Sequence, residues 1–348
     1  MTRTLLTLSP AQFGPIETEI ARCGEFRVGA FAFPSGSLAL RVENAAGHVV
    51  VLPYQGQQVW DACFNGRSLR MKSMFDAPRP TQDFLRTYGA LLIHCGATAV
   101  GPPGPEDDHP PHGELPNAPM DRAWIEIGED GVTVGGDYRY TVAFQTDYVF
   151  RPSLELGPGS TELAASVEIE NLKRSEMELF YLAHINFRAV DGMTLRDNAA
   201  GLRVRMDMPA HVPEVGELGR RLAALSEAPH LHRTLAAGER YDPELVLFMD
   251  FEEGTALCLA EHPEGFADFV RYDRAALPSA LRWISRTEDQ DCLGLVLPST
   301  SEGEGCAKER RKGKAVRLAG RSVWRCSYTF GCLGRAETRD LVSTHALA

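Results

Sequence analysis

Short runs of β-branched and aromatic residues, separated by turns rich in Gly, Pro, Asn and Asp, recur along most of the 348-residue chain. The clearest pair of runs, residues 153–156 and 161–171, is joined by the turn sequence GPGS. In the second run, apolar residues occupy every other position, at Leu163, Ala165, Val167 and Ile169. Because side chains alternate between the two faces of a strand, this pattern predicts a β-hairpin with one buried face.

The same pattern predicts further strands, whereas helical periodicity is scarce. Strands are expected over residues 49–52, 58–60, 124–127, 132–134, 138–151, 178–188, 245–250, 255–260, 293–297 and 323–330. Short helices are expected over residues 9–23, 81–88 and 216–227. Regularly spaced strands without βαβ alternation predict an all-β fold, an antiparallel sandwich with a few short helices.

The chain has no internal repeat and no break in composition that calls for two domains. We therefore expect a single domain over residues 1–348, with a lead-in at 1–45, a core sandwich at 46–332 and a tail at 333–348. The formal net charge of −11 argues against nucleic acid as a partner, because phosphate binding needs clustered Lys and Arg. The one basic run, residues 309–314, is predicted to be a charged turn between two strands.

Neither a signal peptide nor an apolar stretch of about 18 residues is evident, so we expect no membrane contact. The eight cysteines are scattered and form no CxxC pair, which favours reduced thiols. These features predict a cytoplasmic protein. The acidic composition neither requires nor forbids a homodimer.

The loop at residues 101–117 overlaps the stretch HPPHGELPNAP, residues 109–119, whose prolines exclude a regular helix or a central strand. A loop this long between strands is commonly functional, and its rigid framing suits a binding site. His112 and Asn117 are therefore candidate site residues. The alternative is structural: His112 caps a turn, and Asn117 supports the loop by an Asx hydrogen bond.

A second candidate, His184, lies in the stretch FYLAHINFR at residues 180–188. Residues of one parity share a face of a strand, which here places Phe180, Leu182, His184, Asn186 and Arg188 together. Polar groups on such a face must be hydrogen-bonded or face a cavity. The imidazole is suited to proton transfer near neutrality, although it could equally be a hydrogen-bonded core histidine.

Four histidines, His94, His109, His112 and His184, could together hold a divalent metal, because imidazole is a common ligand. Only His109 and His112 are closely spaced, and His94 adjoins Cys95, which would point to the opposite face of a strand. No Walker loop, GxGxxG, GxSxG or HExxH motif is present. We therefore expect no metal and no other cofactor, and keep a metal-dependent sugar isomerase as an alternative.

Six stretches between about residues 52 and 330 occur in the order found in one known superfamily. They are LPYQGQQVW, GALLIHCG, PHGELPNAP, AHINFR, LPSALRW and LGLVLPST. By these motifs the chain resembles the aldose 1-epimerase (galactose mutarotase-like) superfamily, and more closely its bacterial branch of unknown function. The resemblance implies an antiparallel β-supersandwich whose concave face binds a sugar.

In mutarotases a His protonates the ring oxygen and a Glu removes the anomeric hydroxyl proton. The resemblance implies that His184 is the general acid, that His112 is a second histidine on the sugar, and that Asn117 supports the loop or the ligand. Leu297 stands where the glutamate is expected. Gln55 and Glu114 both replace arginines. The base could then have moved to Glu302, to Glu304 or to Glu114.

The sequence thus predicts a cytoplasmic epimerase or mutarotase that uses His184 and His112 on a small carbohydrate. Two other functions remain open: another proton transfer on a carbohydrate, and sugar binding without turnover in a regulatory protein. The residues expected to contact the substrate are Asn117, Asn186, Glu114, Gln55 and Arg188.

Overall fold

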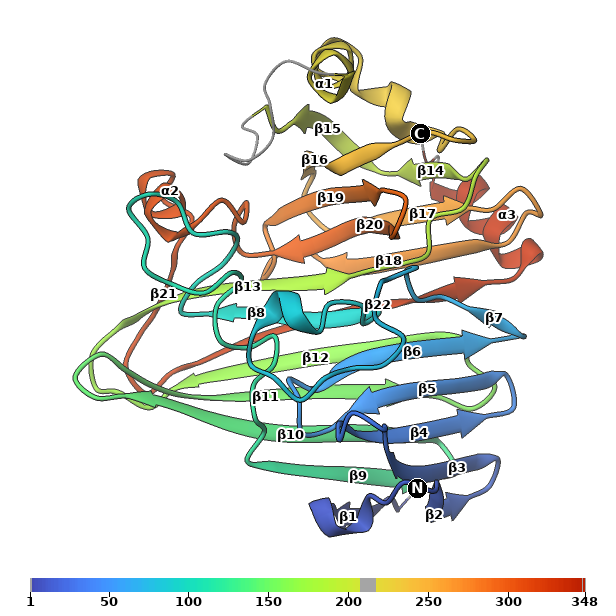
Figure 1. Ribbon diagram of the computed structural model, residues 1–348, viewed down its shortest axis with the longest axis vertical. Helices are drawn as coiled ribbons and strands as arrows, with labels where there is room; N and C mark the ends of the chain where they lie inside the picture. The colour runs from blue at the N-terminus through green and yellow to red at the C-terminus, as the bar shows by residue number, and fades with distance from the viewer. Residues whose placement is uncertain (1, 207–216, 346, 348) are drawn as a thin grey trace.

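The computed structural model describes residues 2–206, 217–345 and 347, and Figure 1 shows its two stacked sheets. The strands are β1 (Thr4–Thr7), β2 (Thr18–Cys23), β3 (Phe26–Ala32), β4 (Leu38–Asn44), β5 (Gly47–Leu52), β6 (Gln58–Phe64), β7 (Arg67–Ser68), β8 (Leu92–Ala97), β9 (Arg122–Gly128), β10 (Gly131–Val142), β11 (Thr146–Leu156), β12 (Glu162–Asn171), β13 (Met177–Ile185), β14 (Thr194–Asp197), β15 (Ala199–Val204), β16 (Tyr241–Phe251), β17 (Thr255–Glu261), β18 (Ala267–Asp273), β19 (Ser279–Arg286), β20 (Asp291–Ser299), β21 (Val316–Leu318) and β22 (Val323–Leu333). The helices are α1 (Glu217–Glu227), α2 (Cys306–Arg311) and α3 (Arg335–His345), with 3₁₀ turns η1 (Pro10–Gln12), η2 (Phe84–Arg86) and η3 (Pro229–Arg233).

The strands form two large sheets that stack face to face. The nine-stranded sheet has the order β1-β9-β10-β11-β12-β22-β18-β17-β14. The thirteen-stranded sheet has the order β15-β16-β19-β20-β13-β8-β6-β5-β4-β3-β2, with β21 added on β13 and β7 on β6. In Figure 1 this order runs from blue β2 at the bottom to β15 near the top. Neighbouring strands pair antiparallel, and the predicted antiparallel sandwich is confirmed.

The main core lies between the two sheets, and the β11–β12 hairpin shows how the sequence builds it. Leu163 and Ile169 are fully buried, whereas Ala164 and Ser166, between them on the strand, are exposed. The strand pairs residue by residue with β11, with Leu154 opposite Ala165. Fully burying a Leu or Ile side chain contributes about 1.5–3 kcal/mol, which fixes the register of the hairpin.

A second apolar cluster lies on the other face of the thirteen-stranded sheet, away from the nine-stranded sheet. Along β13, Leu179 and Tyr181 pack in the inter-sheet core, whereas Phe180 and Leu182 pack in this second cluster. His184 follows with the parity of Leu182. The predicted shared face is therefore confirmed for Phe180, Leu182 and His184, whereas β13 ends at Ile185, before Asn186 and Arg188. This face is the outer face of the sheet, and it positions the candidate site.

Two of the expected helices are wrong. Residues 9–23 form only the 3₁₀ turn η1 and then the strand β2, because β2 pairs with β3, with one register shift between Glu19 and Ala21. Residues 81–88 contain only the 3₁₀ turn η2, capped by the Asp83 carboxylate, which accepts from the Leu85 amide at 3.2 Å. The third prediction is confirmed by α1, with Gly216 outside the described residues.

Two other boundaries differ from expectation. The run at 138–151 is two strands, because Phe144 takes a left-handed φ of 67° and the Gln145 amide donates to the Val142 carbonyl, which closes a turn. The basic run at 309–314 is not a simple turn: its first half completes helix α2, and Lys312 and Lys314 reach back to acidic side chains.

The expected lead-in, residues 1–45, contributes β1 to one sheet and β2, β3 and β4 to the other. The expected tail contains α3. Within the part of the chain that the structure describes, no helix is both long enough and apolar enough to cross a membrane. All eight cysteines carry free thiols.

Candidate functional site

His184 lies at the end of β13, and Asn186 fixes its ring. The Asn186 side chain donates through Nδ2 to the Ala90 carbonyl at 3.0 Å, which leaves its Oδ1 as an acceptor. His184 Nδ1 lies 2.7 Å from that oxygen, so Nδ1 carries the proton and donates it. Nε2 of the neutral ring then presents a lone pair. The chain thus selects the tautomer in which His184 can accept a proton at Nε2.

His112 lies beside His184, with ring centroids 5.5 Å apart and planes at 75°. The loop places it there by backbone contacts with the end of β8: the Gly96 amide donates to the His112 carbonyl at 2.9 Å, and the His112 amide donates to the Gly101 carbonyl at 3.0 Å. His112 has a left-handed φ of 61°, which costs free energy for a residue with a side chain. This strain is held by the surrounding contacts, as is common at functional sites.

Aromatic rings surround the two imidazoles. Tyr88 and Trp283 contact the His184 ring edge to face, with centroid separations of 5.7 and 5.2 Å. Phe84 contacts the His112 ring at 4.9 Å. Phe84 belongs to η2 and Tyr88 follows it, so the segment after β7 covers the histidine pair, and His184 is only 5% exposed.

Both imidazoles are neutral at physiological pH. Burial lowers the pKa of His184 to about 4, although the hydrogen bond to Asn186 and the negative charge of Glu244 both act to raise it. Burial lowers the pKa of His112 to about 3, with a smaller contribution from the positive charges of neighbouring histidines. A buried neutral imidazole is a proton acceptor, and it becomes an acid only after it has taken a proton.

The Trp283 indole contacts both His184 and the carboxylate of Glu244. The Trp283 indole Nε1 donates to Glu244 Oε2 at 2.6 Å, and Arg205 forms an ion pair with the other oxygen of the same carboxylate. The three groups come from neighbouring or nearby strands of one sheet, Glu244 from β16, Trp283 from β19 and His184 from β13. No recognisable motif surrounds Glu244, so it was not among the residues predicted from the sequence.

The arrangement can be compared with known proteins. The model of the family described as Domain of unknown function (DUF4432) matches residues 34–332. The chain belongs to this family. No curated protein matches this DUF4432 protein.

Solved structures with the same fold are distant in sequence. A candidate aldose 1-epimerase from Klebsiella pneumoniae superposes with a TM-score of 0.79 at 14% identity, over 99% of this chain and 91% of that one. A galactose mutarotase-like protein from Clostridium acetobutylicum gives 0.62 at 13% identity, over 89% and 99%. Galactose 1-epimerase from Lactobacillus acidophilus gives 0.54 at 13%, over 91% and 98%. The DUF4432 protein therefore has the galactose mutarotase-like fold that the sequence motifs led us to expect.

Leu297 lies on β20 in the apolar cluster of the site face, 3% exposed. Of the three carboxylates considered as a replacement for the missing base, Glu302 and Glu304 form ion pairs. Glu302 binds Arg203 and Lys314 at 3.0 and 2.8 Å and also pairs with Lys312. Burial raises the pKa of the Glu302 carboxyl, but the ammonium groups of Lys312 and Lys314 outweigh this and lower the pKa to about 2. An acid of such low pKa is a poor general base.

Glu304 and Glu114 are also engaged away from the histidine pair. Glu304 pairs with Lys308 at 2.7 Å and with Lys312. Glu114 accepts from the Thr98 amide and hydroxyl at 3.1 and 2.7 Å, and from the Tyr148 hydroxyl of β11 at 2.5 Å. Glu114 thus joins the loop to both sheets. The structure assigns these two side chains to structural contacts, and neither is brought together with His184.

The amides predicted to bind substrate form internal hydrogen bonds. Gln55 Nε2 donates to Asn117 Oδ1 at 2.9 Å, and Gln58 Nε2 donates to the same oxygen at 2.8 Å. This buried network holds the loop that carries His112. Asn186, fully buried, orients His184. Arg188 is exposed beyond the end of β13.

A positive group that the sequence reasoning missed lies on the same face. The Arg70 guanidinium stacks over the Trp60 ring at 4.9 Å, and its Nη1 is buried without a hydrogen-bond partner. Burial lowers the pKa of Arg70, with smaller effects from neighbouring charges. A buried, unpaired guanidinium nitrogen is costly unless a ligand satisfies it, so Arg70 is a candidate for contacting substrate.

The four histidines of the metal alternative are not gathered. His94 points into the inter-sheet core, where its Nδ1 lies 2.7 Å from the Tyr181 hydroxyl, and burial lowers its pKa to about 3. His109 lies with Asp107 rather than with His112. Among the described residues these four histidines therefore do not form the single metal site that the alternative required.

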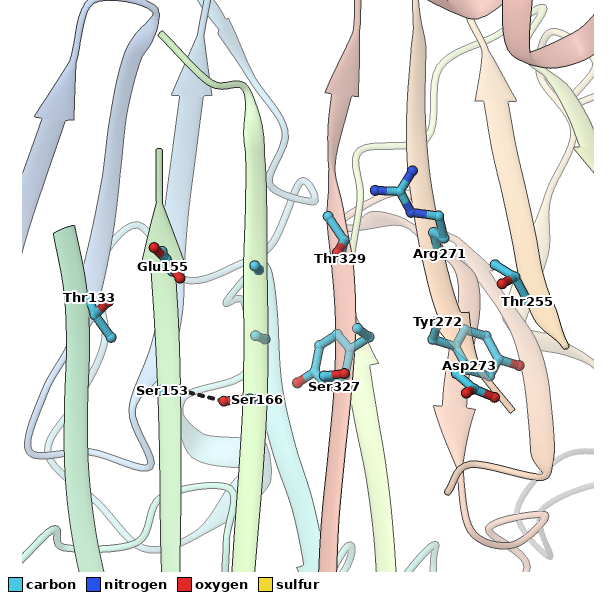
Figure 2. Close-up of a pocket in the computed structure, with 13 residues that line it drawn as sticks. Thr133, Ser153, Glu155, Ser166, Thr255, Arg271, Tyr272, Asp273, Ser327 and Thr329 are labelled. Carbon is cyan, nitrogen blue, oxygen red and sulfur yellow. Dashed lines mark hydrogen bonds between the residues drawn. The ribbon is translucent and has the colours of Figure 1, made fainter. Parts of the chain in front are cut away.

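An open hollow of about 390 Å³ lies elsewhere, on the outer face of the nine-stranded sheet. Figure 2 shows its hydroxyl-rich lining, in which the Ser153 and Ser166 hydroxyls are 2.6 Å apart. None of the predicted site residues lines this hollow. We place the candidate site at the histidine pair because two imidazoles lie together there, one of them on a strained backbone, and aromatic rings shield both from solvent.

Proposed function

We propose that this protein binds a carbohydrate in the cytoplasm and catalyses a proton transfer on it, as an aldose 1-epimerase-like isomerase. The observation that carries the proposal is the contact between His112 and His184 on the site face, with the tautomer of His184 set by Asn186. The galactose mutarotase-like fold supports a sugar as the substrate.

The proposed mechanism uses His184 in both roles. Neutral Nε2 accepts the proton of the anomeric hydroxyl while the bond between C1 and the ring oxygen breaks and the C1 carbonyl forms. The resulting imidazolium gives the proton to the ring oxygen. The aldehyde rotates, and the steps run in reverse. Glu244 stabilises the transient positive charge, since its carboxylate already favours the protonated ring.

The remaining groups bind and shield the sugar. His112 contacts the hydroxyl groups next to the anomeric centre, and Trp283 offers an apolar ring face against which a pyranose can pack. Arg70 supplies the positive group that is missing at Gln55. The Phe84–Tyr88 segment must move aside to admit the sugar, because it covers both imidazoles.

A second function, sugar binding without turnover, is favoured by one specific observation. Leu297 fills the position of the expected glutamate and is buried in an apolar cluster. On this interpretation the histidines only donate and accept hydrogen bonds. A sugar would then raise the melting temperature by mass action, with no change in its anomeric ratio.

Saturation-transfer NMR with a panel of aldoses and acidic sugars separates the two functions. The first predicts faster exchange between the α and β anomers of at least one sugar, a loss of about 10²–10⁴-fold in His184→Gln, and a smaller loss in Glu244→Gln. His230→Gln, at an exposed histidine, is the matched control and should exchange at the wild-type rate. Thermal stabilisation without exchange would favour binding alone. Neither effect with any sugar would refute both.

A further inference from the structure

The loop at residues 101–117 meets the start of α2 at a group of three potential metal ligands. Asp107, His109 and Cys306 each offer one ligand atom, and the three atoms lie within 4.8 Å of one another. Among the described residues this is the one group of three or more such side chains. It does not include either histidine of the pair, and no proposed step of the sugar chemistry uses it.

The His109 ring is oriented as a metal ligand would be. Nδ1 lies 2.9 Å from the Pro110 carbonyl, so Nδ1 carries the proton and Nε2 presents its lone pair. Nε2 is buried without a hydrogen-bond partner and lies 3.8 Å from Asp107 Oδ2. Two acceptors facing each other need a proton or a cation between them. A backbone carbonyl bound to the other ring nitrogen is the usual support of a ligating histidine.

Asp107 is held in place before any ion binds. Its Oδ2 accepts from the Gly104 amide at 3.0 Å, and its Oδ1 accepts from the Ala307 amide at 2.8 Å. These two amide donors fix the orientation of the Asp107 carboxylate. Gly305 has a φ of +88°, and a Cβ there would lie 2.5 Å from Oδ2. Glycine at that position leaves the carboxylate room.

We propose that Asp107, His109 and Cys306 bind a transition-metal ion of the Zn²⁺ type. The mixed sulfur, nitrogen and oxygen donors suit such an ion and not Ca²⁺ or Mg²⁺, which take oxygen ligands. A tetrahedral ion with bonds of about 2.1 Å has ligand atoms about 3.4 Å apart. The 3.8 Å between His109 Nε2 and Asp107 Oδ2 is close to this, and the Cys306 Sγ lies within 4.8 Å of both atoms.

The fourth position of the ion would face a cavity of about 490 Å³ that all three ligands line, together with Glu106 and Asp108. Water or a small anionic ligand could occupy it. The ion would also clip the loop that carries His112 to helix α2, two segments far apart in the sequence.

The test uses the full chain after treatment with a chelator, titrated with Co²⁺ and with Zn²⁺. We expect one ion per chain, a thiolate-to-Co²⁺ charge-transfer absorption, and a higher melting temperature with Zn²⁺. Cys306→Ser and His109→Gln should lose the absorption and weaken binding on the order of 100-fold or more. Cys63→Ser and His230→Gln, at a partly exposed cysteine and an exposed histidine, are the matched controls and should bind as the wild type does.

Circular dichroism of each variant checks that the variant is folded. If a variant does not fold, the Co²⁺ absorption spectrum of the wild-type protein still tests the proposal. A Co²⁺ complex of the wild type without the thiolate band would overturn the site. Equal affinity in Cys306→Ser or His109→Gln and in the wild type would do the same. Anomer exchange is measured separately, so failure of the metal site and failure of the sugar chemistry are distinguishable.

Discussion

Acidification from about pH 7 to about pH 5.5 is expected to destabilise this protein strongly, because four buried histidines must be neutral in the folded state. Burial lowers the pKa of His94, His112 and His232 to about 3 and that of His184 to about 4. For His232 the positive charge of Arg282 adds to the effect of burial. In the unfolded chain each imidazole has a pKa of about 6.5.

The sign follows from proton counting. A folded pKa below the unfolded one means that the unfolded state binds more protons, so stability is fully present above about pH 6.5 and falls as the pH drops toward the folded pKa. Between about pH 7 and about pH 5.5 each such histidine costs about 1.3 kcal/mol, and four cost about 5 kcal/mol. This result requires only that each folded pKa lie below about 4.5.

Other titratable groups have a smaller effect on how the free energy of unfolding changes between about pH 7 and about pH 5.5. Glu302 has its pKa lowered to about 2, and it titrates in the unfolded chain near pH 4.5, below the window. Burial raises the pKa of Glu114 and Glu309, despite hydrogen bonds that oppose it, so these carboxyls act in the opposite direction. Burial also lowers the pKa of His48, which adds to the effect of the other histidines.

The measurement is urea unfolding at fixed temperature across this pH range. A loss of about 5 kcal/mol is a large part of the 5–15 kcal/mol typical of a folded domain, so the midpoint should move visibly. His94→Gln should reduce the number of protons taken up on unfolding by about one, and the free energy of unfolding should then change less with pH. His230→Gln, which changes an exposed side chain, should leave this number unchanged. A flat free energy of unfolding over this range would refute the assignment of neutral buried imidazoles.

Three further changes test the packing around the site. Arg282→Met leaves the fully buried Asp197 carboxylate with one fewer cation, so the free energy of unfolding measured in urea should fall by about 3–5 kcal/mol. A fall of less than about 1 kcal/mol would contradict the buried ion pair. Gly113→Ala places a Cβ 2.4 Å from the Gly96 carbonyl oxygen at a φ of +75°, so it should lower both the melting temperature and the rate of anomer exchange. An unchanged exchange rate would show that catalysis does not depend on the geometry of this loop. Glu302→Gln removes the charge from an ion-pair cluster and should lower the melting temperature while anomer exchange persists, whereas loss of exchange in a folded variant would restore Glu302 as the base.

The fold could be predicted because its signal is local. Alternation of apolar and polar residues, as in the β11–β12 hairpin, follows from the period of a strand and needs no knowledge of distant contacts. The failures lie where tertiary contacts overrule local preference. Residues 18–23 have a weak helical pattern, but β3 supplies a pairing partner, and the strand wins.

The site could be predicted only in part, and for the same reason. His184 and Asn186 lie two residues apart, so their shared face was readable from the strand period. Glu244 reaches the site through an indole on another strand, and no sequence spacing records that contact. Glu302 follows β20 closely in sequence, which made it a candidate base, but Lys312 and Lys314 fold back to neutralise it.

Leu297 is an apolar side chain on the site face, and burial is the largest effect on the pKa of His184. A glutamate at position 297 would bring a negative charge to the face on which His184 lies, and such a charge raises the pKa of a nearby imidazole and supports it as a standing acid. With leucine there, burial dominates and the imidazole is neutral. Glu244 raises the pKa too weakly to reverse this. Leucine at position 297 is therefore compatible with the proposed mechanism, in which His184 first accepts a proton.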